Sequence, residues 1–496
     1  NNFTCDGKCI TNSRSEPERR NKIKEKLFSV EDCNNLNINE VHDLYRKHVN
    51  ASRVNLLSSF GFGNDLASHS EGAYVFTKSE KKILDFTGGI GVLNHGHNHP
   101  RILKVRKQCQ KDLRMEVHRN FFSPYIAALG HNIATILPGD LNYSFFVNSG
   151  SETVEWALKT AFKYHNGARS AVLYSDIAFH GKLFGAESVT SSPENSFNYP
   201  KIPRTHKFKF NDIGSIRALT KKIKNEKDAL DIAAIIIEPF NVSNLLECSE
   251  PFLRELRSIC DELDIVLIFD EVYSGWCKTG PLFNFMKFDN LIPDVLCTAK
   301  SIGGGKSSIA GLITRERVFK KAFDTPSSAN LQTTTYYGFG EETVTAIEAI
   351  NIIQEEKFED KARYVQSLLQ PALNVLMLKY PKIIKESRGS GALFGLFLKK
   401  PSKLISQAIS VLPGELFKDP RFLEKLILSS IIDDLYEDGK VLTFTSLGRD
   451  LHLIISPPLI VKKEEIDYFI ESLDKTLSKG IPSLVGNFCK NKLTKR

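Results

Sequence analysis

The chain has 496 residues, of which 42% are hydrophobic and 25% are charged, a composition typical of a folded globular protein. Its formal net charge of +8 is small for this length and its basic residues are scattered, so nucleic acid is not an expected partner. No apolar stretch reaches the length needed to span a bilayer. We expect a soluble protein without membrane partners, built as one large α/β domain with appendages or as two or three domains.

The cysteines indicate a reducing compartment and no metal site. They are nine in number, which is odd, and are spread from Cys5 to Cys489, a pattern that does not suit a disulfide framework. Cys5 and Cys9 in CDGKC have no second pair nearby to complete a zinc site. We therefore predict a cytoplasmic protein without a bound metal.

The N-terminal part changes character at about residue 52. Residues 1–50 are polar and charged with weak periodicity, and we expect them to form an extension. Residues 73–86, AYVFTKSEKKILDF, predict two strands joined by a polar turn. They lead into a loop rich in glycine and histidine, TGGIGVLNHGHNHP.

Four later segments predict buried strands of a parallel sheet. Each is a compact apolar run with β-branched residues that ends abruptly in a polar residue or glycine, and they cover residues 142–150, 232–239, 264–272 and 294–300. Helical spacing lies between them, as in residues 251–263. Strands that alternate with helices indicate an α/β domain whose ligands bind beyond the carboxyl ends of the strands. The polar residues that end these runs should therefore face one crevice.

After about residue 340 the pattern predicts a smaller α+β domain. Residues 341–356 have helical spacing, residues 392–398 and 451–459 have the composition of strands, and residues 464–477 form an amphipathic helix.

The segment VNSGSETVEWALK predicts an anion site where a strand leads into a helix. Free N–H groups of Gly150 and Ser151, the Ser151 hydroxyl and the helix dipole would converge on one point, suited to a phosphate or carboxylate. Ser149 and Ser151 could equally serve only as helix N-caps.

Asp270 and Lys300 end two consecutive strands and suggest a cofactor. A carboxylate at the end of the apolar run DIVLIFD needs a cation or strong donor, which could be a protonated heteroaromatic nitrogen, nearby backbone N–H groups or an arginine. Phe179 and His180 in AFHGK supply an aromatic face. Phosphate cradle, aromatic face, buried aspartate and strand-end lysine together match the needs of pyridoxal phosphate, which forms a Schiff base with a lysine amine.

The run GGGKSS offers an alternative interpretation, with Lys306 in a nucleotide-binding loop. That loop needs a glycine five residues before Gly305, and the position is Lys300. It must also open a helix, whereas the following IAGLIT predicts a strand. We therefore favour Lys300 over Lys306 as the reactive lysine.

These motifs resemble those of the class III pyridoxal-phosphate aminotransferases of fold type I, nearest the putrescine and ornithine branch. The resemblance covers about residues 70–480 and rests on FTGGIGVLNHGHNHP, FVNSGSETVEWALK, AFHGK, IIIEP, FDEVYSGWCKTG and TAKSIGGG. It implies a large, mainly parallel-sheet cofactor domain at 111–340 and a small α+β domain at 341–496. Residues 51–110 would contribute to the small domain and would form a substrate-side loop. Residues 1–50 remain outside as the extension.

The resemblance also implies roles for individual residues. Lys300 would form the Schiff base and move the proton, and Asp270 would pair with the ring nitrogen. Glu238 would be an acidic gate beside the substrate. The further cofactor-binding residues would be Ser149, Gly150, Ser151, Phe179, His180, Tyr273 and Thr335. Thr335 would reach the phosphate of a neighbouring subunit, because active sites of this family lie at the interface of a homodimer.

Three positions depart from the family pattern. Tyr273 stands where relatives often have a glutamine that bonds the ring hydroxyl, and its phenol could do the same. YGFGEE replaces GGNP in the loop around Tyr337 and Phe339. Ile454 stands where relatives that use glutamate or 2-oxoglutarate have an arginine, so a substrate carboxylate would lose a strong contact.

Arg449 or His452 could substitute for that arginine, although strand alternation would place Arg449 on the opposite face from Ile454. Our hypothesis is a transaminase for amines or aldehydes with apolar or extended tails. It rests on Ile454 and on the aromatic side chains of Tyr336, Tyr337 and Phe339.

Other functions remain open at this stage. An aminomutase, racemase or decarboxylase of the same fold would use the same lysine and aspartate, because the cofactor supplies the electronic chemistry. A regulatory or assembly protein that keeps the fold without turnover is a further alternative, as is one module of a longer biosynthetic polypeptide.

Overall fold

The structure is a computed structural model of the chain, and it describes residues 27–58, 60–117, 120–191, 199–400, 419, 421–446 and 448–494. Cys5 and Cys9 lie outside this part. The chain divides into two compact units, Asn1–Ser58 and Ser59–Arg496, which are described separately.

The first unit contains short helices that its weak hydrophobic periodicity does not predict. They are α2 (Val30–Asn35), α3 (Ile38–Leu44), the π-helical turn Tyr45–Val49 and α4 (Ala51–Ser58). Ser29 and Asp32 form a reciprocal capping box at the start of α2, and Asn37 and Glu40 form another at α3. These local signals, a polar cap followed three residues later by an acid, start the helices without an apolar stripe.

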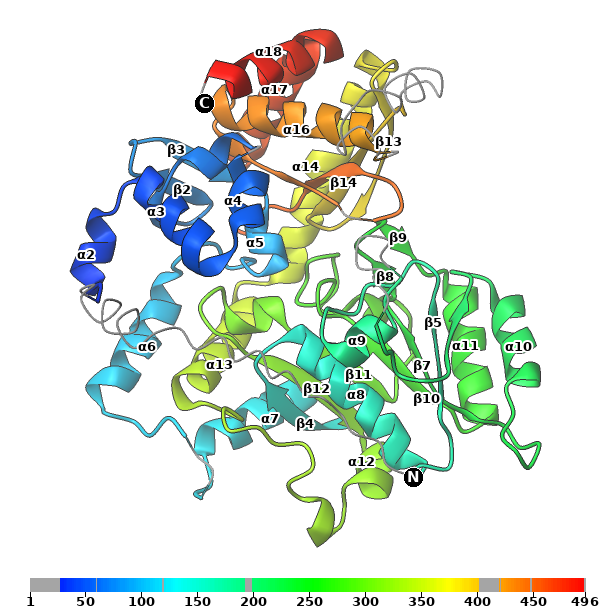
Figure 1. Cartoon of the computed structure of the whole chain (residues 1–496). Coiled ribbons are helices and arrows are strands. Elements are labelled where there is room, and N and C mark those ends of the chain that lie inside the picture. The colour runs from blue at the N-terminus through cyan, green and yellow to red at the C-terminus, as the bar shows by residue number, and fades with distance from the viewer. Residues whose placement is uncertain are drawn as a thin grey trace, which may run out of the picture. The chain divides into compact units, whose positions relative to one another are not determined.

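The second unit is built around a seven-stranded sheet, which confirms the predicted α/β fold (Figure 1). Its strands, in spatial order, are β4 (Leu141–Val147), β12 (Ala310–Arg315), β11 (Val295–Thr298), β10 (Val266–Asp270), β7 (Ile232–Ile237), β5 (Ala171–Ser175) and β6 (Thr205–Phe208). The five strands from β11 to β6 are parallel, while β12 is antiparallel to both of its neighbours. The run after Lys306 is therefore a strand, as predicted, and opens no helix.

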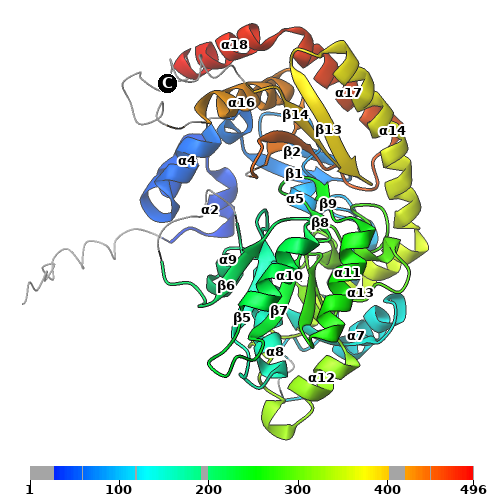
Figure 2. The ribbon, with the colours of Figure 1, turned by 90° about the vertical axis from the view of Figure 1, so that its right-hand side faces the viewer.

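Helices cover both faces of this sheet (Figures 1 and 2). They are α7 (Pro124–Ile136), α8 (Gly150–Tyr164), α9 (Phe184–Ser188), α10 (Ile213–Lys222), α11 (Glu250–Glu262), α12 (Glu316–Ala322) and α13 (Gly340–Glu355), while α6 (Pro100–Lys111) packs against α13. α8 packs on one face in a core with α9 and α12, and α7, α10, α11 and α13 contribute to the core on the other.

Alternation along the strands decides which face receives each terminal acid. In β10, Val266 and Ile268 pack in the α8 core, whereas Leu267 and Phe269 pack in the opposite core. Because successive side chains alternate, Asp270 continues the α8 side. In β7, Ala234 and Ile236 pack in the α8 core, so Glu238, two residues further along, lies on the α8 side as well.

A smaller α+β region contains two four-stranded sheets. One joins N-terminal to C-terminal strands, β1 (Ala67–Glu71), β2 (Tyr74–Thr77), β3 (Lys82–Asp85) and β15 (Val441–Leu442), and the other is β13 (Ile384–Ser390), β14 (Leu393–Leu398), β17 (His452–Ile455) and β16 (Phe444–Thr445). Its helices are α14 (Phe358–Lys379), α16 (Phe422–Glu437), α17 (Lys463–Ser478) and α18 (Ile481–Thr494). A two-stranded ribbon, β8 (Phe240–Asn241) and β9 (Leu246–Glu247), follows β7.

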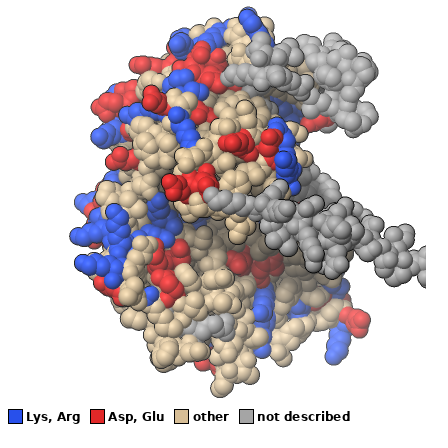
Figure 3. All heavy atoms as spheres, turned by 60° about the vertical axis from the view of Figure 1, so that its left-hand side comes forward, with Lys and Arg blue, Asp and Glu red and all other residues tan. Residues whose placement is uncertain are grey.

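The surface carries both signs of charge. On the face in Figure 3, basic and acidic side chains are interspersed. Within the described part of the chain, no helix is long and apolar enough to cross a membrane.

Candidate active site

A cavity of about 830 Å³ lies where the carboxyl ends of β5, β7, β10 and β11 meet the start of α8. The predicted site residues that line it are Ser149, Gly150, Ser151, Phe179, His180, Glu238, Asp270, Tyr273 and Lys300. The expectation that the polar ends of the strands face one crevice is therefore confirmed.

The first turn of α8 presents backbone donors to this cavity. Ser149 is the N-cap, and its hydroxyl exchanges hydrogen bonds with the N–H and carboxylate of Glu152. N–H groups in the first turn have no intrahelical acceptor, so Gly150 and Ser151 can bind an anion. A Cβ on Gly150 would lie 2.6 Å from Cγ1 of Val272, so only glycine lets this turn approach the end of β10 so closely.

Asp270 is held by two donors and remains in the cavity wall. Its Oδ2 accepts a hydrogen bond from Nδ1 of the buried His180 at 2.7 Å, and its Oδ1 accepts one from the Val272 N–H at 3.0 Å. Nε2 of His180 is buried and has no hydrogen-bond partner among the described residues. These contacts fix the carboxylate and leave it able to accept a further donor.

Glu238 belongs to a network of amides. Its Oε2 accepts hydrogen bonds from the Phe179 N–H at 2.9 Å and from the Asn241 side chain at 2.7 Å. Burial raises the pKa of Glu238 to about 7, against the opposing effect of His180. A carboxyl with this pKa can hold or release a proton at neutral pH.

Lys300 begins a 3₁₀ turn with a left-handed backbone, φ +55°. Burial lowers the pKa of its amine to about 7, although the carboxylates of Asp270 and Glu238 oppose this effect. A large share of the amine is therefore neutral and nucleophilic at neutral pH. Its Nζ lies 3.5 Å from the ring centroid of Tyr273.

The phenol of Tyr273 contacts the smaller α+β region, just after β17. Its hydroxyl lies 3.4 Å from Oγ of Ser456, and burial raises the pKa of the phenol. The ring of Tyr273 therefore faces the cavity, whatever its hydroxyl contacts.

The expected placement of Arg449 is wrong. β17 begins only at His452, so Arg449 lies in the preceding loop, where strand alternation does not apply, and both Arg449 and Ile454 line the cavity. Nη2 of Arg449 forms an ion pair with Oδ2 of Asp176 at 3.2 Å.

His452 does not face a carboxylate site. It is fully buried, its Nδ1 donates to the Asp450 carbonyl at 2.9 Å, and burial lowers its pKa to about 4. With the proton on Nδ1 the remaining Nε2 can only accept a hydrogen bond. Of the two candidate substitutes for the missing arginine, only Arg449 is a cation at the cavity.

Thr335 is exposed and does not border the described cavity of its own chain. The pattern also missed Asp176, which follows β5 and lines the cavity. The run SAVLYSD has the same form as the four strands that were recognised, so the same signal would have found it.

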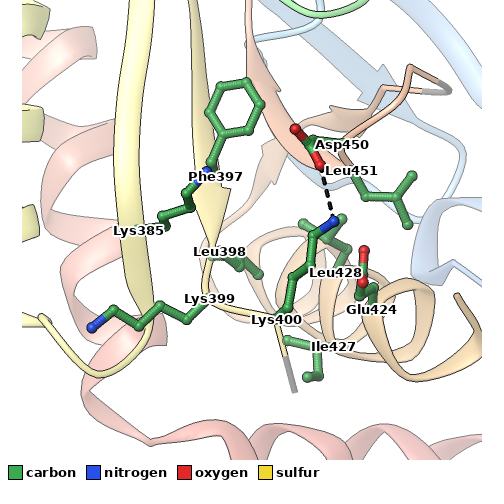
Figure 4. Close-up of a pocket in the computed structure, with 10 residues that line it drawn as sticks. All are labelled: Lys385, Phe397, Leu398, Lys399, Lys400, Glu424, Ile427, Leu428, Asp450 and Leu451. Atoms are coloured by element: carbon green, nitrogen blue, oxygen red, sulfur yellow. Dashed lines mark ion pairs between the residues drawn. The ribbon is translucent and has the colours of Figure 1, made fainter. Parts of the chain in front are cut away.

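A second hollow, lined by residues of β13, β14, α16 and the loop before β17, is far smaller, at about 20 Å³ (Figure 4). Lys400 pairs with Asp450 at 3.0 Å beside it, and Lys399 points away from this pair. The space suffices for about one water molecule, so it is no candidate for a substrate site. Among the described residues, no cluster of three or more histidine, cysteine or acidic side chains is arranged to hold a metal.

The sequence matches the family described as Aminotransferase class-III over residues 64–477. The chain belongs to the class III aminotransferases. It is therefore a pyridoxal-phosphate-dependent transaminase, and the alternative reaction types and the non-catalytic interpretation are not favoured.

Solved structures of the same fold include several transaminases. An ornithine aminotransferase from Toxoplasma gondii ME49 has 21% identity and a TM-score of 0.73, covering 92% of this chain and 97% of that one. A transaminase from the marine bacterium Virgibacillus has 20% identity and a TM-score of 0.76, over 90% and 99%. An (S)-enantioselective omega-transaminase from Thermomicrobium roseum has 20% identity and a TM-score of 0.75, over 90% and 99%. At 20–21% identity, the similarity to these structures shows the fold alone.

The residues present fit the cofactor of this aminotransferase family. The glycine-dependent turn of α8 offers anion donors, the fixed carboxylate of Asp270 can accept from a ring N–H, and the Lys300 amine lies in the same cavity.

Proposed function

We propose that this aminotransferase moves an amino group between an amine or omega-amino donor and an aldehyde or oxo-acid, with Lys300 as the amine that binds the cofactor covalently. The proposal rests on one observation. A buried lysine, an aspartate held by hydrogen bonds and the first turn of a helix all line the same cavity.

Pyridoxal phosphate, when bound, supplies an aldehyde that condenses with amines and a protonated ring that takes up electron density. Gly150 and Ser151 would hold its phosphate through their N–H groups. Asp270, oriented by His180, would keep a proton on the ring nitrogen, and Phe179 would cover one face of the ring. The Lys300 amine, with its pKa near 7, would take and return the proton at the substrate carbon.

The test is the visible absorption spectrum of the protein with added cofactor, before and after borohydride, for the native chain and for Lys300→Ala. We expect a band that borohydride fixes covalently in the native protein and that the variant does not form. An identical band in both proteins would mean that another lysine binds the cofactor.

For the substrate, we propose an apolar or extended tail beside the guanidinium of Arg449. Phe240, Val242 and Ile454 pack together in the wall of the cavity, with Phe444 against them. Arg449, paired with Asp176, is the cation at this wall. A carboxylate of an oxo-acid would have to compete with Asp176 for this arginine, which supports weak use of dicarboxylic acceptors.

An acceptor screen tests this assignment. Long-chain aldehydes should accept the amino group better than 2-oxoglutarate, and Arg449→Ala should lower turnover with oxo-acids by about tenfold or more while aldehydes are little affected. Strong, exclusive preference of the native enzyme for 2-oxoglutarate would contradict the proposal.

We further propose a homodimer. Five large apolar side chains from two chain segments are exposed, namely Leu113, Met115, Phe121, Phe122 and Tyr336, and Phe122 has no cover at all. A backbone hydrogen bond of 2.9 Å from the Gly340 N–H to the Glu116 carbonyl links the two segments. Exposed apolar surface of this kind is typical of an interaction site, and a second copy would bring Thr335 to a neighbouring cavity.

We assign the protein to a reducing compartment such as the cytoplasm. Support comes from the seven described cysteines, which are all free thiols, five of them buried.

A further inference from the structure

The Lys300 amine rests on the face of an aromatic ring. Its Nζ lies 3.5 Å from the centroid of Tyr273, well within the range in which a cation is attracted to the negative face of a ring. Tyr273 stands at a position where relatives of the family often have glutamine, which offers no such face.

The ring is fixed from two sides. Gly91, with φ +83°, approaches so closely that a Cβ there would lie 2.6 Å from Cε1 of Tyr273. On the other side the hydroxyl lies 3.4 Å from Oγ of Ser456. A ring held in this way defines the place of the amine above it, so Lys300 loses little freedom when it reacts.

The charged groups around the amine have opposing effects. Asp270 and Glu238 favour the ammonium form, whereas burial and the buried Lys278 disfavour it. His180 donates a hydrogen bond to the carboxylate of Asp270 and holds it in place. The Tyr273 ring adds attraction for the ammonium form, and this contribution does not depend on its hydroxyl.

We propose that Tyr273 is a positioning residue that holds the Lys300 amine through its ring face, with its hydroxyl serving only to anchor the ring on Ser456. The inference rests on the proposed role of Lys300. It predicts that a phenylalanine, whose ring still packs against Gly91, keeps nearly native behaviour, whereas an aliphatic side chain does not.

The test measures how fast the full-length chain, depleted of cofactor, captures added pyridoxal phosphate covalently as a function of pH, followed by absorbance. Tyr273→Leu should shift the midpoint of the rate profile down by about one pH unit. Its plateau at high pH, where the amine is neutral, should fall about tenfold, because the Lys300 side chain no longer packs against a fixed ring. Tyr273→Phe should keep the native midpoint within about 0.3 units and the native plateau within about twofold.

Each outcome has a distinct meaning. Equal changes in Tyr273→Phe and Tyr273→Leu would show that the hydroxyl matters, and no change in either would show that the ring does not; both overturn the proposal. Capture by Lys300→Ala at the native rate would instead overturn the assignment of Lys300. Tyr273→Met, with a flexible side chain of similar length, replaces the leucine variant if that variant does not fold.

Discussion

A buried lysine amine carries a cost in stability that depends on pH. Burial lowers the pKa of Lys300 from 10.5 to about 7, so the unfolded chain binds a proton more readily than the folded chain. The free energy of unfolding therefore rises with pH between about 7 and 10.5. Below the pKa that Lys300 has in the folded protein, the full cost of burying the charged amine applies.

We predict that Lys300→Met stabilises the cofactor-free protein, and more strongly at pH 6 than at pH 9. The expected gain in the free energy of unfolding is about 2–4 kcal/mol at pH 6 and shrinks as pH rises. Urea denaturation of both proteins at several pH values measures it. The exposed Lys306, six residues away, serves as the control, because Lys306→Met removes a lysine outside the buried site. A gain for Lys300→Met that is equal at all pH values would mean that the native amine is not buried as a neutral group.

At this scale, the sequence pattern identifies the residues that end strands. Asp270, Glu238 and Lys300 follow apolar runs, and the cavity unites them. The orientation of Tyr273 was beyond the pattern, because it depends on Gly91 and Ser456, which are distant along the chain. The placement of Arg449 was wrong because it depended on where β17 begins, and strand boundaries are the least certain part of any pattern.

Among the elements, the start of α8 has little room for a side chain at position 150. A Cβ at Gly150 would lie 2.6 Å from Val272 Cγ1, so alanine must push the first turn away from the end of β10. The N–H groups that we assign to the phosphate would move with it.

We predict that Gly150→Ala weakens cofactor binding by about 10- to 100-fold, because a displacement near 1 Å misaligns the donors. Titration of the cofactor-depleted protein, followed by absorbance, measures this. Gly130→Ala in α7 is the matched control, because a Cβ there meets nothing within 4 Å, and it should leave binding unchanged and stabilise the helix by about 0.5–1 kcal/mol. Native affinity in Gly150→Ala would show that the phosphate binds elsewhere.

The sheet shows how far element prediction extends. Apolar runs and their spacing predict β4, β7, β10 and β11 and the helices between them, because burial on both faces leaves a continuous apolar signature. The antiparallel direction of β12 between β4 and β11 leaves no such signature, since a buried strand has the same composition in either direction. The helices α2 and α3 depend on capping rather than on an apolar stripe, and periodicity alone overlooks them.

At the scale of the whole molecule, the proposed homodimer determines whether one chain contains a complete site. Thr335 is exposed and absent from the described lining of its own cavity, whereas Lys300 lies inside that cavity. A symmetric dimer repeats each contact twice, so each site would take Lys300 from one chain and Thr335 from the other.

Two inactive variants should therefore restore activity when they share a dimer. Lys300→Ala removes the amine, and Thr335→Asp places a negative charge where we expect the neighbouring phosphate. With random pairing, about half of the dimers are mixed, and each mixed dimer has one site with both native residues, so the co-expressed pair should recover about a quarter of native turnover. Adding Phe122→Asp to both chains should separate the subunits and abolish the recovery, whereas Leu378→Asp on α14, also exposed, should not. If Thr335 served its own chain, every site in a mixed dimer would carry one defect, and co-expression would give no more activity than the two variants measured separately.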